Sequence, residues 1–353
     1  MTIFEEKINN YLVEANRMLK NTKSRKLSSL FYNDISVLLT IIYNNGLDVD
    51  VDSIFQRSDL IFDSTDSEDK FVESFLKSYI EAIKVNNKVG DLGPYFYNKY
   101  GDGYYKEFRT LMNIEDSIDL CHRFFEFYDK DLADYFNHIL KHKNLAIGGC
   151  SWDDTTAGCT FSLVSQCEPF IIVNQFKSIY LPYVITHEVI HDYIENAFND
   201  KTFEKTCIKE SNRLDEVYSR FIELVFTLFL EEIHFNKNDI EALNLCFDNS
   251  LIDMLNNYNF YLKNVDVEAI VSIDELFSDY VSREAYSYGG VLAYHYFDDY
   301  LRNPERCKDN ITNFSLNTMN HDKLFLLNNY GLKEENLGKS RVLSKHMKNH
   351  FKY

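Results

Sequence analysis

The sequence predicts a mainly α-helical protein with one small β-hairpin. Residues that break helices are scarce, since the 353 residues include 12 Gly and 4 Pro, and no glycine lies between Gly158 and Gly289. Apolar residues recur at the three-four spacing of a helix in several long stretches. Only residues 159–164 and 170–176 are rich in β-branched and aromatic side chains, and residues 166–169 between them have the composition of a turn.

The predicted elements follow one another along the chain. Thr2 and Glu5 form a capping box that opens a first helix, whose apolar stripe includes Ile8 and Leu12. A second stripe predicts a helix over residues 71–83. Residues 90–103 hold four glycines and a proline and are the best candidate for a hinge or boundary. Helical spacing returns from residue 114 to residue 145, ahead of the hairpin.

The length allows one large or two smaller domains. We expect an N-terminal helical region over residues 1–110 and a catalytic region over residues 111–353, or else one continuous domain. The formal charge of -18 disfavours binding to nucleic acid or to an anionic membrane surface. No segment approaches the length of an apolar membrane span, and the N-terminus lacks a secretory signal, so we expect a cytoplasmic protein. Nothing in the sequence indicates its oligomeric state.

The chemistry is concentrated in one motif after Pro182, which suits the first turn of a helix. His187-Glu188-x-x-His191 places two histidines one turn apart, so both imidazoles can reach a single Zn²⁺ ion. Glu188 is next to the first histidine and is expected to act as the base that takes a proton from zinc-bound water. Because the surrounding residues are apolar nearly all round, the helix should be buried, and a cation would compensate the buried polar groups.

A third ligand is expected from a second, antiparallel helix, because three successive turns of one helix point along one line. Residues 214–226 have helical spacing, and Glu216 and Glu223 lie two turns apart on nearly one face. Glu216 is the predicted zinc ligand. Glu223 is either a second carboxylate that orients a histidine or a charge that faces solvent.

These residues resemble the thimet oligopeptidase and oligoendopeptidase F peptidases, zinc peptidases of the M3 type. The resemblance covers roughly residues 145–300 and is carried by His187-Glu188-x-x-His191, by the gap to Glu216, and by Glu216-x-x-Ser219-x-x-x-Glu223. It implies a helical zinc-peptidase fold with the small β-hairpin or sheet beside the zinc helix, one Zn²⁺ per chain and a peptide substrate.

The resemblance also implies roles for two further segments. The strand over residues 170–174 is expected to offer its edge to an extended peptide, which assigns substrate binding to Phe170, Ile172 and Asn174. In the tyrosine-rich segment that ends at Gly289-Gly290, Tyr288 and then Tyr286 are the candidates for donating a hydrogen bond to the oxyanion.

The sequence departs from the family pattern at Ile190, where a glycine usually stands, and at Ile194, where a histidine is frequent. The chain is also shorter than typical members. The predicted function is that of a zinc-dependent endopeptidase acting on oligopeptides. The alternatives are a specialised protease for one peptide or protein partner, a zinc-containing module that binds peptides without hydrolysing them, and a helical scaffold in which the motif arises by chance.

Overall fold

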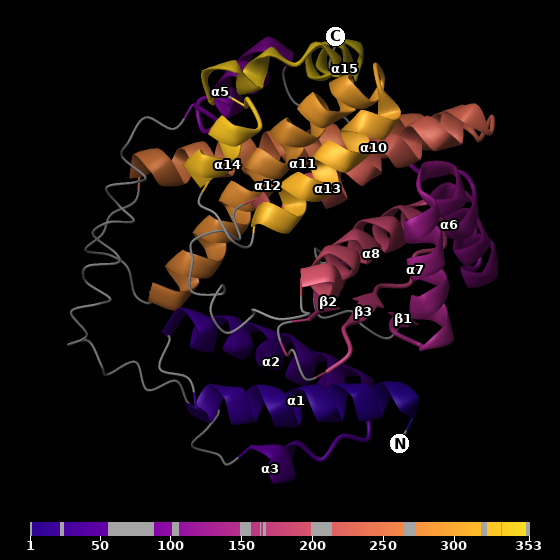
Figure 1. The fold of residues 1–353 in the computed structure, drawn as a ribbon, viewed down its shortest axis with the longest axis vertical. Coiled ribbons are helices and arrows are strands. Elements are labelled where there is room, and N and C mark those ends of the chain that lie inside the picture. The colour runs from indigo at the N-terminus through magenta and orange to yellow at the C-terminus, as the bar shows by residue number, and fades with distance from the viewer. Residues whose placement is uncertain are drawn as a thin grey trace. The chain divides into compact units, whose positions relative to one another are not determined.

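The computed structural model describes residues 2–21, 25–55, 88–100, 106–148, 157–162, 164, 167–198, 214–264, 273–318, 323–332 and 334–350. Within these ranges the protein is mainly helical and contains a three-stranded sheet, as the sequence predicts (Figure 1). None of the helices in these ranges combines the length and the apolar character needed to cross a membrane.

The chain groups into two compact units that are each assembled from separate segments. The first contains Met1–Ile61, Glu107–Lys209 and Val225–Ile240, and the second contains Phe62–Lys106, Glu210–Leu224 and Glu241–Tyr353. The predicted division between residues 110 and 111 stays a prediction.

The first unit combines helices with the sheet. Its elements are α1 (Ile3–Asn21), α2 (Arg25–Asn45), α3 (Val51–Ile54), α6 (Ile114–Tyr128), α7 (Lys130–Lys141), β1 (Leu145–Ile147), β2 (Gly158–Phe161), β3 (Phe170–Val173) and α8 (Tyr180–Phe198). Helix α10 (Glu216–Glu232) begins in the segment that belongs to the second unit and ends in the first.

In its described residues the second unit consists of helices and the turns that join them. It contains α5 (Leu92–Tyr100), most of α11 (Lys237–Asn264), α12 (Ile273–Tyr300), α13 (Pro304–Thr318), α14 (Lys323–Asn329), the 3₁₀ helix η3 (Glu334–Lys339) and α15 (Arg341–His350). Helix α12 packs against α13, η3 and α15.

The predicted start of the first helix is confirmed. The backbone N–H of Thr2 donates to the Glu5 carboxylate, and the N–H of Glu5 donates to Thr2 Oγ1 over 3.2 Å, which is the reciprocal pair of a capping box. The apolar stripe of α1 faces inward: Tyr11 is fully buried and packs edge-on against Phe161 and Phe170 of the sheet. The core of the first unit therefore includes α1, α2 and the sheet.

The sheet corrects one sequence-based expectation. Its strand order is β1-β3-β2, with β1 parallel and β2 antiparallel to β3. Strand β3 is thus central, and its backbone pairs on both sides, so it offers no edge to a peptide. The expectation that Phe170, Ile172 and Asn174 present such an edge is wrong, because β1 was too short to be recognised in the sequence. Phe170 and Ile172 are instead buried in the core.

Most of the glycine-rich stretch over residues 90–103 forms helix α5. Its predicted role as a hinge or boundary stays a prediction. Gly93 lets α5 approach α11 closely, since a Cβ at this position would lie 2.7 Å from the backbone carbonyl of Leu255. The helix predicted over residues 71–83 lies outside the described residues.

Candidate metal centre

Helix α8 carries the histidine motif and is buried along most of its length. Pro182 lies in its first turn, where a missing N–H costs no helical hydrogen bond. Every residue from 181 to 190 is buried, and the helix packs against α6, α7, β2 and β3. The sequence predicts a buried helix here because apolar residues surround it nearly all round, and this prediction is confirmed.

His187 and His191 face each other on one side of α8. Their Nε2 atoms lie 3.2 Å apart, and the exposed fraction of His187 is 7%. Tetrahedral ligands with bonds of about 2.0–2.1 Å lie roughly 3.3–3.4 Å from each other, which matches this spacing. The two histidines therefore fit a metal ion held by both Nε2 atoms.

Glu188 is buried beside the histidines and is held by strand β2. Thr160 Oγ1 donates to Glu188 Oε2 over 2.9 Å and also lies 3.2 Å from the Glu188 backbone carbonyl. Gly158 provides the space, because a Cβ there would lie 2.8 Å from Glu188 Cγ and Oε1. Because the Thr160 hydroxyl binds Oε2, the other carboxylate oxygen, Oε1, can accept a proton, as a general base must.

Asp192 follows the second histidine and is tied to helix α7. The Tyr135 hydroxyl donates to Asp192 Oδ2 over 2.9 Å. Burial raises the pKa of Asp192 to about 7, and the hydrogen bond from Tyr135 opposes this shift. The contact anchors the end of the motif on a neighbouring helix.

Glu216 is the first residue of α10 and lies in the segment that belongs to the second unit. It is 8% exposed, and Ser219 Oγ donates to its Oε2 over 3.2 Å. Gly289 of α12 packs directly against it, since a Cβ at Gly289 would lie 2.7 Å from Glu216 Cβ and 3.1 Å from its carbonyl carbon. The glycine that ends the tyrosine-rich segment thus brings α12 against the predicted ligand.

Glu223 is buried, not exposed to solvent as one interpretation of the sequence allowed. It is 4% exposed, and Arg220 Nη1 donates to its Oε2 over 2.6 Å. The Arg220 guanidinium also lies 4.0 Å from the centre of the Phe247 ring. A role for Glu223 in orienting a histidine stays a prediction.

Tyr288 is fully buried in the middle of α12, and Tyr286 is partly buried. Their predicted part in stabilising an oxyanion stays a prediction. Sequence reasoning missed the contact of Thr160 with Glu188 and the contact of Arg220 with Glu223. The glycine at position 158, in a short strand just ahead of the histidine helix, is the signal that could have pointed to contact between β2 and Glu188.

Within the first unit, one set of three side chains in the described residues has the donor types needed to hold a metal ion: His138, His142 and Glu168. The sequence did not point to this set. The assignment of His187, His191 and Glu216 as zinc ligands stays a prediction.

Comparison with solved structures returns peptidases, the class of protein that the sequence resembles. A candidate oligoendopeptidase F from Bacillus anthracis is 13% identical, with a TM-score of 0.48 over 97% of this chain and 72% of that chain. PZ peptidase A with an inhibitor is 12% identical, also at 0.48, over 97% of this chain and 70% of its own. A candidate peptidase from Chlamydophila abortus is 10% identical, with a TM-score of 0.48 over 92% of this chain and 63% of that chain. No family model and no curated protein matches the chain.

Proposed function

We propose that this chain is a zinc-dependent endopeptidase that hydrolyses peptide bonds in oligopeptides. The observation that carries the proposal is the pair of histidines on α8, with His187 buried, His191 half-buried, their Nε2 atoms 3.2 Å apart and Glu188 between them in sequence. Imidazole pairs with this spacing and a neighbouring carboxylate suit metal-assisted hydrolysis.

Glu216 is the proposed third ligand. It lies in the second helix from which the sequence predicts the third ligand, and two imidazoles and one carboxylate make up a donor set that suits zinc. When bound, zinc polarises a peptide carbonyl and lowers the pKa of water at its open position.

Glu188 is the proposed general base. Its carboxylate takes the proton of the attacking water and later returns that proton to the leaving amine. Thr160 holds Oε2 in place, so Oε1 remains for the water. Tyr288 or Tyr286 is the proposed donor to the oxyanion.

Strand β2 replaces β3 as the proposed docking strand for the substrate backbone. It is at the edge of the described sheet, and its Thr160 side chain touches Glu188. The Asn174 N–H donates to Ala157 O, and hydrogen-bonded pairs alternate along an antiparallel ladder. The backbone groups of Gly158 and Thr160 are therefore directed away from β3, toward the position that an added strand would take.

Replacing Glu188 with Gln tests the proposal. Glutamine keeps the shape of the side chain but cannot accept the proton, so we expect peptide hydrolysis to fall by about 10²–10⁴-fold while bound zinc is retained. Digestion of a mixed peptide library, with zinc content measured for both proteins, checks this result.

The wild type provides the decisive control. If it holds zinc but leaves every peptide intact, general oligopeptidase activity is wrong, and a dedicated partner or a binding role replaces it. If Glu188→Gln cuts as fast as the wild type, Glu188 is not the base.

A further inference from the structure

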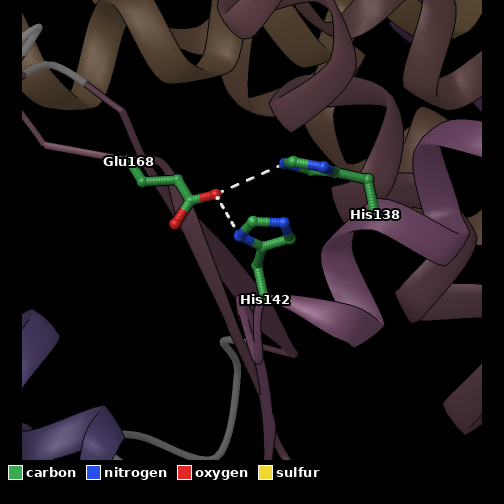
Figure 2. Close-up of side chains that lie close together, drawn as sticks. All are labelled: His138, His142 and Glu168. Atoms are coloured by element: carbon green, nitrogen blue, oxygen red, sulfur yellow. Dashed lines mark ion pairs between the residues drawn. The ribbon is translucent and has the colours of Figure 1, made fainter.

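A second cluster of metal-ligand side chains lies on the surface of the first unit, and we name it the surface histidine cluster: His138, His142 and Glu168. His138 is in the last turn of α7, His142 caps that helix, and Glu168 lies two residues before β3. Figure 2 shows both imidazoles directed toward the carboxylate of Glu168. None of the three residues takes part in the proposed catalysis.

The geometry converges on one carboxylate oxygen. His138 Nε2 and His142 Nδ1 each lie 3.3 Å from Glu168 Oε1. The two rings are stacked, with centroids 4.1 Å apart and an interplanar angle of 26°. Ligand atoms around a tetrahedral zinc ion are separated by roughly 3.3–3.4 Å, given bonds of about 2.0–2.1 Å. Two of the three ligand separations already have this value, and all three lie within 4.8 Å.

The other oxygen of Glu168 is held by a separate set of contacts. Lys7 Nζ lies 3.1 Å from Glu168 Oε2 and also donates to Asn144 Oδ1 over 2.5 Å. The contact with Lys7 therefore engages Oε2 and leaves Oε1 directed toward the histidines.

We propose that the surface histidine cluster binds a divalent transition-metal ion, with zinc as the natural occupant. Two imidazoles and one carboxylate suit Zn²⁺, Ni²⁺ or Cu²⁺, whereas Mg²⁺ and Ca²⁺ prefer oxygen ligands alone. The side chains of His138, His142 and Glu168 are 45%, 41% and 39% exposed, which leaves the remaining coordination positions to water.

The bound ion ties two elements together. It links the C-terminal end of α7 to the segment that leads into β3, and β3 packs against α8. Since metal that binds only the folded state stabilises that state, the ion acts as a structural cross-link of the first unit.

Zinc titration of the metal-stripped full chain, followed by calorimetry and native mass spectrometry, tests this proposal. We expect His138→Gln to bind one zinc equivalent fewer than the wild type, or to bind it more than tenfold more weakly, because losing a direct ligand costs more than losing an outer partner. His234→Asn is the control, because His234 is exposed and belongs to neither candidate metal set. It should bind zinc as the wild type does.

Glu168→Gln provides a second variant that removes a different ligand and should lose the same equivalent. Circular dichroism confirms that each variant is folded. Equal stoichiometry and affinity in wild type, His138→Gln and Glu168→Gln would overturn the proposal and leave the cluster as a network of ion pairs. Both variants keep the α8 histidines, so peptide hydrolysis by these variants reports on the proposed function independently.

Discussion

At Gly158 the space that a side chain would occupy is filled by the Glu188 carboxylate. A Cβ would lie 2.8 Å from Glu188 Cγ and Oε1 and 3.0 Å from Cδ. By contrast, a Cβ at Gly289 would meet the backbone of Glu216, which cannot move without its helix. The two glycines are therefore needed for different reasons. Gly158 leaves room for the Glu188 side chain, and Gly289 allows α12 to pack closely against α10.

We expect Gly158→Ala to lower kcat by about tenfold or more with little change in stability, because Glu188 is displaced from a pre-organised position. Gly289→Ala should lower the free energy of unfolding by about 1–3 kcal/mol, as overpacking against backbone does. Peptide hydrolysis and urea unfolding of both variants check this pair of outcomes. The interpretation of Gly158 is wrong if its variant hydrolyses peptides at the wild-type rate.

Strand β2 is the element that connects the sheet to the proposed base. The Thr160 side chain contacts Glu188, while its backbone is directed toward the outer edge of the sheet. Proline is tolerated in an edge strand where the lost N–H faces away from the neighbouring strand. Substitutions of Thr160 can therefore separate the contribution of its backbone N–H to substrate binding from the contribution of its hydroxyl.

Thr160→Pro and Thr160→Val both remove the hydroxyl, but only proline removes the N–H. We expect the proline variant to have a KM about three- to tenfold above that of the valine variant, since one net hydrogen bond contributes about 0.5–1.5 kcal/mol. Steady-state kinetics on one peptide substrate measure the difference. Equal KM values would show that the substrate backbone does not pair with β2 at this residue.

Helices α1 and α2 are joined by a buried pair, Tyr11 and Asp34, in which the phenol donates to the carboxylate. Burial raises the pKa of Asp34 to about 7, although the hydrogen bond from Tyr11 opposes the shift. An unfolded aspartate has a pKa of about 3.9. Between these values the folded state holds a proton that the unfolded state releases, so this contribution to stability is lost as the pH rises toward 7.

We therefore expect the wild type to lose about 1–3 kcal/mol more stability than Asp34→Asn between pH 5 and pH 8. Urea unfolding at both pH values measures this difference. Asp48→Asn serves as the control, because Asp48 is an exposed aspartate in the same N-terminal region. The same decline in wild type and Asp34→Asn would show that Asp34 is not the group responsible.

For the whole molecule, the proposed metal couples activity to stability. His187 and Glu188 are each 7% exposed, and buried polar groups without a compensating cation are destabilising. We expect a chelator to abolish peptide hydrolysis and lower the Tm, and added zinc to restore both. His138→Gln should respond in the same way in hydrolysis. Full hydrolysis by a protein verified as metal-free would contradict the zinc mechanism.

The long helices and the burial of α8 could be predicted because they depend on local sequence. Few glycines and prolines, a capping box at Thr2 and an apolar sequence around the histidine motif each act within one or two turns. The spacing of His187 and His191 follows from the helical repeat alone. Residues four apart on a helix have Cβ atoms about 5–6 Å apart on one face, which allows the two Nε2 atoms to approach to 3.2 Å.

Tertiary structure decided what depends on pairing between distant segments. Strand β1 has only three residues, and its parallel pairing makes β3 central, which removes the expected edge from Phe170, Ile172 and Asn174. Contact between Thr160 and Glu188, and the approach of Glu168 to His138 and His142, also join residues that lie far apart in the sequence. The Arg220–Glu223 pair is local, and only its burial depends on tertiary packing. The sequence by itself determined which residues can do chemistry, because side-chain type and helical spacing are local. Only folding decided which backbone edge and which second set of ligands accompany them, because those depend on the register and packing of separate elements.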